Sequence, residues 1–127
     1  MKTVLIDTNF LVECARNKID IQTELRRILD TSFDTAILDR TMDELETIVA
    51  RGGKEGSWAK LAKTILLTKK VTIIATSGGH TDNLLLDRAN ADTIIATMDK
   101  ELKRKLKKKL QDVVIIRAAK KLAVVNA

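Results

Sequence analysis

The sequence predicts an α/β fold of three layers, with helices on both faces of a central parallel sheet of about five strands. Two observations predict it. Short apolar runs alternate along the chain with segments whose apolar residues recur at helical spacing. Three of the runs, at residues 3–6, 71–75 and 113–116, show no polar alternation beyond an occasional Thr, as expected of strands covered on both faces. The length of 127 residues suits a single domain over residues 1–127.

Each element is placed by its own pattern. Strands are expected where short runs rich in Val, Ile and Thr are bounded by polar turn residues. Helices are expected where apolar residues recur at helical spacing behind a capping residue. The first strand is expected to run into a polar turn at Asp7-Thr8-Asn9, and the glycine-rich loop at residues 51–56 to end a helix. In chain order the expected strands cover residues 3–6, 35–38, 71–75, 93–96 and 113–116, and the expected helices cover residues 20–30 or begin at Thr41, Ser57, Thr81 and just after Asp99.

Composition limits the kinds of function. Aromatic residues make up only 2% of the chain, which predicts an aliphatic core and nearly excludes an aromatic platform for base stacking. The single cysteine, Cys14, allows no intramolecular disulfide and is expected to be a buried small hydrophobe. The apolar run before Asp7 is far too short for a signal peptide or a membrane span. We therefore expect a soluble, cytoplasmic protein with no membrane partner.

Positive charge is concentrated in one part of the chain. The formal net charge is +6, yet residues 100–121 hold ten Lys or Arg against Glu101 and Asp112, which leaves the rest of the chain at −2. Such a segment favours a polyanionic partner, nucleic acid before membrane, and a solvated helix face with a basic bias is an equally good explanation. The helix after Asp99 has apolar residues at Leu102, Leu106 and Leu110 and lysines on its other sides. If this helix follows RNA phosphates, its candidate contacts are Lys103, Arg104 and Lys107.

Four carboxylates are expected at one edge of the sheet. Asp7 follows the first strand, and Glu44 lies one turn into the helix after the second. Asp82 begins the helix after the third strand, and Asp99 follows the fourth. The carboxyl ends of parallel strands meet at one edge, where open α/β sheets bind their ligands. Two unit charges ~5 Å apart repel by about 3 kcal/mol at an effective dielectric of ~20, so the cluster requires a cation or protonation.

Oxygen ligands without His or Cys favour Mg²⁺ or Mn²⁺ over Zn²⁺. A metal held by carboxylates activates water and neutralises charge on a phosphoryl group, so phosphodiester hydrolysis is the simplest interpretation. Each acid also has a purely structural explanation. Glu44 completes a capping box with Thr41, Asp99 is a helix N-cap, and Asp82 is a first-turn acid. This explanation is weakest for Asp7, because an acid that closes a buried strand needs a specific partner.

Four motifs resemble those of the PIN-domain family. Val4-Leu5-Ile6-Asp7-Thr8-Asn9 is similar to the family's opening strand and Asp-Thr-Asn signature, and Met42-Asp43-Glu44-Leu45 to its second acidic motif. Thr81-Asp82-Asn83-Leu84-Leu85 resembles its third acidic motif, and residues 94–102 resemble its closing Thr-x-Asp-x-x-Leu. The motifs stand in order over nearly the whole chain. The loop at Arg51-Gly52-Gly53-Lys54 and the lysine-rich helix are more similar to stand-alone archaeal PIN proteins related to ribosomal-RNA processing nucleases than to VapC-type toxins.

The resemblance implies a metal-dependent endoribonuclease that uses Mg²⁺ or Mn²⁺. It implies that four acids bind the metal and act in catalysis: Asp7, Glu44, Asp82 and Asp99. Asn9 and Thr97 match positions that orient the first acid, the metal or the attacking water. Two residues depart from the family's pattern. Asn83 stands where many relatives have a second Asp, which lowers the expected metal affinity, and Met98 replaces a commoner polar residue with little expected effect.

Other polar residues compete for a place in the site. Asp92 precedes the fourth strand and so lies at the opposite edge of the sheet, which excludes it. Asp39 and Asp43 are neighbours of the site in sequence and are minor candidates. His80 lies in a loop, where a lone histidine is more often without a role than in contact with substrate.

Three other functions are weighed against a processing nuclease. Phosphatases of the haloacid dehalogenase type place a second Asp where this chain has Asn9, which weakens that hypothesis. A catalytically weak RNA- or ribosome-binding PIN module would be indicated by the loss of a motif acid, and none is lost. A toxin ribonuclease of a toxin–antitoxin pair is the third alternative. The sequence leaves open the RNA substrate, a homodimer, and a ribosomal-precursor or antitoxin partner.

Overall fold

The computed structural model describes residues 1–77, 79–109, 111–118 and 121–126. Strands and helices are mixed along this part of the chain, which begins and ends with a strand. The strands are β1 (Lys2–Ile6), β2 (Phe33–Leu38), β3 (Thr72–Ile74), β4 (Thr93–Ala96), β5 (Asp112–Arg117) and β6 (Lys121–Asn126). The helices are α1 (Thr8–Arg16), α2 (Ile21–Ile28), α3 (Asp39–Arg51), α4 (Gly53–Thr68), α5 (Thr81–Arg88) and α6 (Lys100–Lys108).

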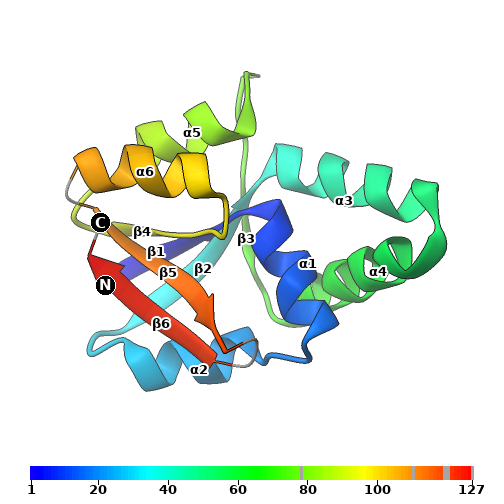
Figure 1. Ribbon diagram of the computed structural model, residues 1–127, viewed down its shortest axis with the longest axis horizontal. Helices are drawn as coiled ribbons and strands as arrows, with labels where there is room; N and C mark the ends of the chain where they lie inside the picture. Colours follow the sequence, from blue (N-terminus) through cyan, green and yellow to red (C-terminus); the bar gives the residue numbers. More distant parts are fainter. Residues whose placement is uncertain (78, 110, 119–120, 127) are drawn as a thin grey trace.

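The strands form one sheet in the order β3-β2-β1-β4-β5-β6. Strands β1 to β5 are parallel to their neighbours, and β6 runs antiparallel to β5. Helices α5 and α6 cover one face of the sheet, whereas α1 and α2 pack on the other face together with α3 and α4 (Figure 1). The predicted three-layer α/β architecture with a central parallel sheet is confirmed, and the sheet has one strand more than expected.

Strand β1 is buried on both faces and divides the core in two. Val4 and Ile6 belong to the cluster that contains Phe10 of α1, and Leu5 belongs to the cluster that contains Leu85 of α5. These three strand residues are at most 1% exposed. Successive side chains of a strand point to opposite faces, so a strand covered on both sides needs an unbroken apolar run. Packing on both faces thus fixes the place where β1 ends and the following acid begins.

The polar turn expected after β1 is wrong, because α1 begins at once. Asp7 is the N-cap of this helix, and its side chain accepts a hydrogen bond from the backbone N–H of Thr8. The buried face of α1 includes Phe10, Leu11 and Cys14. These residues follow helical spacing, which was the overlooked signal. Cys14 is 1% exposed, so the expectation of a buried small hydrophobe is confirmed.

Strand β3 is not covered on both faces, contrary to the expectation for residues 71–75. It lies at the edge of the sheet, pairs with β2, and leaves Ile73 53% exposed. Its partner in register, Ile37 of β2, is fully buried. A local apolar run cannot distinguish a central strand from an edge strand, because the distinction depends on sheet order.

Strand β6, which was not predicted, closes the other edge of the sheet and is held by α2. The carboxylate of Glu24 accepts a hydrogen bond from the backbone N–H of Leu122 at 2.9 Å, and Arg27 donates to the carbonyl of Leu122 at 2.8 Å. Glu24 and Arg27 also pair with each other, one helical turn apart. Leu122 itself is buried in the core beside Leu25 of α2. The helix and the strand therefore stabilise each other's position.

Helices α3 and α4 form a hairpin that extends away from the sheet (Figure 1). α3 begins at Asp39, two residues before the expected Thr41, and α4 begins at Gly53 without a cap from Ser57. Gly52 and Gly53 have φ angles of 75° and 69°, which favour glycine, so the turn between the helices is tight. A Cβ on Gly56 would lie 3.2 Å from two carbonyl oxygens of α3, so the helices approach closely there.

Helix α6 packs as predicted through Leu102 and Leu106, which are both fully buried. Leu110, the third expected member of its apolar stripe, and Lys120 of the basic segment lie outside the described residues. Within the described ranges, no helix combines the length and the apolar character needed to cross a membrane.

The contrast between Ile37 and Ile73 gives a test of the sheet order. Ile37→Ala should lower the free energy of unfolding by about 2–5 kcal/mol, because it leaves a cavity in the core. Ile73→Ala should lower it by less than about 1 kcal/mol, since the side chain is half in solvent. Urea unfolding monitored by circular dichroism measures both. Equal losses in the free energy of unfolding would mean that Ile73 is buried as deeply as Ile37.

Candidate active site

The four predicted acids line one pocket at the carboxyl ends of the central strands. β1 and β4 are neighbours at the point where the strand order reverses, which is where open α/β sheets bind ligands. The backbone N–H of Asp7 donates to the carbonyl of Ala96 at 2.9 Å and joins these two strand ends. The pocket has a volume of about 270 Å³. Its lining consists of Asp7, Thr8, Asn9, Glu44, Thr47, Ile48, Arg51, Thr81, Asp82 and Asp99.

Asp7 is the most firmly held of the acids. It is 5% exposed, and its Oδ1 accepts from the backbone N–H of Thr8 at 2.8 Å. Its Oδ2 accepts from the hydroxyl of Thr97, also at 2.8 Å. The Thr97 hydroxyl accepts in turn from the backbone N–H of Asp99 at 3.1 Å. Thr97, which the family resemblance singled out as a supporting residue, therefore links two of the acids. Asn9, the other supporting residue, is exposed at the pocket.

Glu44 is held by two threonine hydroxyls. Its Oε1 accepts from Thr8 at 2.6 Å and from Thr81 at 3.2 Å. The capping-box explanation for Glu44 is therefore wrong, because the side chain reaches toward α1 and α5 and not back to the start of its own helix. Sequence reasoning missed both threonines as site residues. The available signal was their position, since Thr8 directly follows Asp7 and Thr81 directly precedes Asp82.

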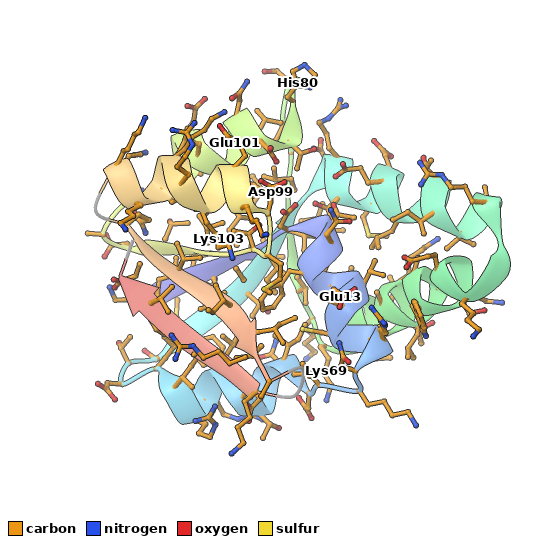
Figure 2. The ribbon with its side chains drawn as sticks, in the orientation of Figure 1. Glu13, Lys69, His80, Asp99, Glu101 and Lys103 are labelled. Carbon is orange, nitrogen blue, oxygen red and sulfur yellow. The ribbon has the colours of Figure 1, made fainter. Side chains whose placement is uncertain are left out.

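Asp99 and Asp82 complete the acidic lining from the opposite layer of helices. Asp99 is the N-cap of α6, as its structural explanation predicted, and its Oδ1 accepts from the backbone N–H of Leu102 at 2.7 Å. Asp82 lies in the first turn of α5 and is half-buried. Figure 2 shows Asp99 at the start of α6, facing the N-terminal ends of α1 and α3. Capping and lining the pocket are thus compatible roles for one side chain.

The acids perturb one another's protonation. Burial raises the pKa of Asp7 to about 6. Hydrogen bonds from Thr97 and Thr8 lower this pKa, and the charges of Asp82 and Glu44 raise it further. Burial, followed by the negative charge of Asp99, also raises the pKa of Asp82. Removal from water and like charges both disfavour an ionised carboxylate. The pocket therefore disfavours the charged forms of these two carboxylates.

The donor set has the chemistry of a site for a hard cation. Four carboxylates line the pocket, and no His or Cys lies among the described residues of its lining. Burial and the neighbouring acids raise the pKa values of Asp7 and Asp82, and a divalent ion would favour the charged forms of both. Among the described residues, however, no three such side chains stand close enough together to hold an ion as they are placed. Ion binding would therefore require at least one of the four carboxylates to move toward the others.

The predicted RNA contacts on α6 lie outside this pocket. Lys103 is half-buried, Lys107 is exposed, and Arg104 forms an ion pair with Glu101. Arg51, at the end of α3, is the basic residue that the described part of the lining includes. It forms no ion pair with a described residue. A cationic group free to meet an anion therefore stands at the acidic pocket itself.

The competing residues have other positions. Asp39 accepts from the backbone N–H of Thr76 at 3.0 Å and from its hydroxyl at 2.6 Å, and these bonds hold the pKa of Asp39 below its usual range. Asp43 is exposed and Asp92 precedes β4, so neither lies in the pocket lining. His80 precedes α5 and is exposed, far from Asp99 in Figure 2.

A second pocket, of about 300 Å³, lies between α1, α2 and α4 and is mainly apolar. Cys14 is part of its lining, and burial raises the pKa of this thiol to about 12. A thiol with such a pKa stays protonated and is a poor nucleophile. The acidic pocket is therefore the better candidate for chemistry.

Asp7→Asn should stabilise the protein in the absence of metal, and the gain should depend on pH. Folded Asp7 keeps its proton up to about pH 6, whereas the unfolded chain releases it near the ordinary value of 3.8. The protonated Asp7 therefore contributes to the free energy of unfolding of wild type at about pH 4. This contribution, up to about 3 kcal/mol, is lost as the pH rises through 6. The variant has no proton to lose at this position. Urea unfolding in EDTA should show a higher free energy of unfolding for the variant than for wild type at neutral pH, and little or no difference at about pH 4. A difference independent of pH would contradict the raised pKa.

Comparisons with known proteins agree with this geometry. The chain matches a family model described as a PIN like domain over residues 4–119, a range that contains all four acids. It is 33% identical over 124 residues to Ribonuclease VapC4 of Methanocaldococcus jannaschii, covering 94% of each chain. The structure of the PIN domain endonuclease Utp24 aligns with a TM-score of 0.81 and 25% identity, covering 98% of this chain and 92% of that one. The resemblance read from the four motifs is confirmed, and the chain belongs to the PIN-domain family.

Proposed function

We propose that this protein is an endoribonuclease that hydrolyses RNA phosphodiester bonds with the help of Mg²⁺ or Mn²⁺. The observation that carries the proposal is the convergence of Asp7, Glu44, Asp82 and Asp99 on one pocket at the carboxyl ends of β1 and β4. The names of two relatives, a ribonuclease and a PIN domain endonuclease, support a nuclease activity. The basic segment of α6 supports a polyanionic substrate.

The four carboxylates would hold the metal, and a bound ion would supply a polarised water and offset the charge that develops on the phosphoryl group. The chain's own groups prepare this arrangement. Asp7 is anchored through both oxygens before any ligand arrives, so it needs little reorganisation. The hydroxyl of Thr97 hydrogen-bonds both to Asp7 and to the backbone of Asp99 and so holds the two acids next to each other. Asn9 presents an exposed amide at the pocket, where it can hydrogen-bond to water or to RNA.

We propose that RNA phosphates are bound by two sets of cations. Arg51 lies in the pocket lining and is placed for a phosphate next to the scissile bond. Lys103, Arg104 and Lys107 lie further along α6, where they would contact phosphates of the RNA strand beyond the pocket. Arg104 is shared with Glu101, so its contribution is the smallest of the three.

The biological role follows less directly from the pocket. Processing of ribosomal RNA remains the role that the sequence motifs favour. The relative named VapC4 supports the alternative of a toxin ribonuclease with an antitoxin partner. Whichever of these two roles applies, we propose a cytoplasmic location and a homodimer.

Cleavage should require both the metal and the acids. Purified protein should cut RNA in Mn²⁺ or Mg²⁺ and should stop in EDTA. Asp7→Asn and Asp99→Asn should each lower the rate at least about a hundredfold, because each removes a ligand and its charge. Asp92→Asn is the matched control, since this exposed acid lies at the other end of β4 and should keep wild-type activity. Equal activity in wild type and Asp7→Asn would point to a contaminating nuclease and would end the assignment.

Replacement of Lys103, Arg104 and Lys107 with Ala should weaken RNA binding and flatten its salt dependence. Each phosphate contact on a single strand contributes about −0.7 to the slope of log affinity against log salt, so three lost contacts change the slope by about 2. Filter binding across a salt series measures this. Thermal stability should hardly move, since exposed charges contribute little to folding. A triple Ala variant at Lys54, Lys60 and Lys69 removes the same charge from α4 and its C-cap, and a larger effect there would show that RNA enters over α4.

A further inference from the structure

Glu44 stands between the two layers of helices and receives a hydrogen bond from each. Thr8 belongs to α1 on one face of the sheet, and its hydroxyl donates to Oε1 of Glu44 at 2.6 Å. Thr81 belongs to α5 on the opposite face, and its hydroxyl donates to the same oxygen at 3.2 Å. The two bonds therefore meet on one carboxylate oxygen and come from helices on opposite faces of the sheet. They fix Oε1, and Oε2 forms no hydrogen bond with a described residue.

We propose that Thr81 is a positioning residue that holds Glu44 by one oxygen and leaves the second oxygen free for a bound cation. The proposal rests on the proposed metal-dependent function. A carboxylate with one donor still turns about that bond, whereas two donors from different helices fix its plane. Neutral hydroxyls orient the carboxylate and leave its full charge for the ion. Outer groups that orient metal ligands in this way typically account for 10–100-fold in metal affinity.

The Thr81 hydroxyl has no competing structural duty among the described residues. α5 has His80 as its N-cap, and that cap makes no side-chain hydrogen bond. Thr81 is half-buried, so its loss opens no cavity in the core. Thr47 provides the contrast, because it lines the same pocket but donates its hydroxyl to the carbonyl of Asp43 within its own helix at 3.0 Å. The same substitution at the two threonines thus separates a hydroxyl that holds an acid from one that does not.

The experiment is a Mn²⁺ titration of the melting temperature, with RNA cleavage measured at each Mn²⁺ concentration. The variants are Thr81→Val, Thr81→Ala, Thr81→Ser and Thr47→Val, beside wild type and Asp7→Asn. Thr81→Val and Thr81→Ala should each shift the Mn²⁺ midpoint upward about tenfold in both readouts, while the metal-free melting temperature stays near that of wild type. Thr81→Ser retains the hydroxyl and should stay within about twofold of wild type. Thr47→Val should keep the wild-type Mn²⁺ midpoint of the melting temperature, because its hydroxyl donates within its own helix and not to an acid.

A double-mutant cycle tests the route through Glu44. In a Glu44→Gln background, Thr81→Val should cause no further shift, because the acid that it positions is gone. The proposal is overturned if Thr81→Val keeps the wild-type midpoint, if only one of the Val and Ala variants shifts, or if Thr81→Ser fails to rescue. The failure of the proposed function looks different. In that case wild type itself gains no stability from Mn²⁺ and cuts no RNA, and Asp7→Asn behaves like wild type.

Discussion

The burial of acidic side chains side by side at the ends of β1 and β4 is the constraint on which the rest of this small domain depends. Four acids share a pocket, and the pKa values of Asp7 and Asp82 are raised by burial and by their acidic neighbours. Such a site is costly for an isolated chain. Within the part of the chain that the structure describes, none of the four acids forms an ion pair. Threonine hydroxyls and backbone N–H groups donate to Asp7, Glu44 and Asp99, and these neutral donors orient the three carboxylates without cancelling their charge.

The apolar core supplies the stability that this arrangement takes away. Val4, Leu5 and Ile6 are buried on both faces of the sheet, so Asp7 follows a strand that cannot shift. A one-residue slip would exchange the two core faces of β1 and would move the acid out of contact with Thr97. The precision of the pocket therefore comes from residues that never touch it. Functional sites commonly carry strain or unfavourable charge that the surrounding packing compensates.

Local patterns predicted the layers and the four acids because both follow from simple rules. A short apolar run closing on Asp7 marks a strand end, and the carboxyl ends of parallel strands gather at one edge. What escaped prediction depends on contacts that are distant in sequence. Neither the exposure of Ile73 nor the existence of β6 can be read locally, because each depends on sheet order and on pairing with distant segments. Thr8 and Thr81 were missed as donors to Glu44 since a threonine hydroxyl leaves no periodic signal.

The bond between Thr97 and Asp7 has a consequence for how the protein folds. Its two partners are 90 positions apart, and the strands that bring them together, β1 and β4, are separated by most of the other elements. Native pairing of this kind is slow to form, because a long loop must close before the contact is made. A nascent or partly folded chain has Asp7 but not its partner, so it cannot assemble the pocket. The complete acidic pocket therefore cannot form before β4 has paired with β1.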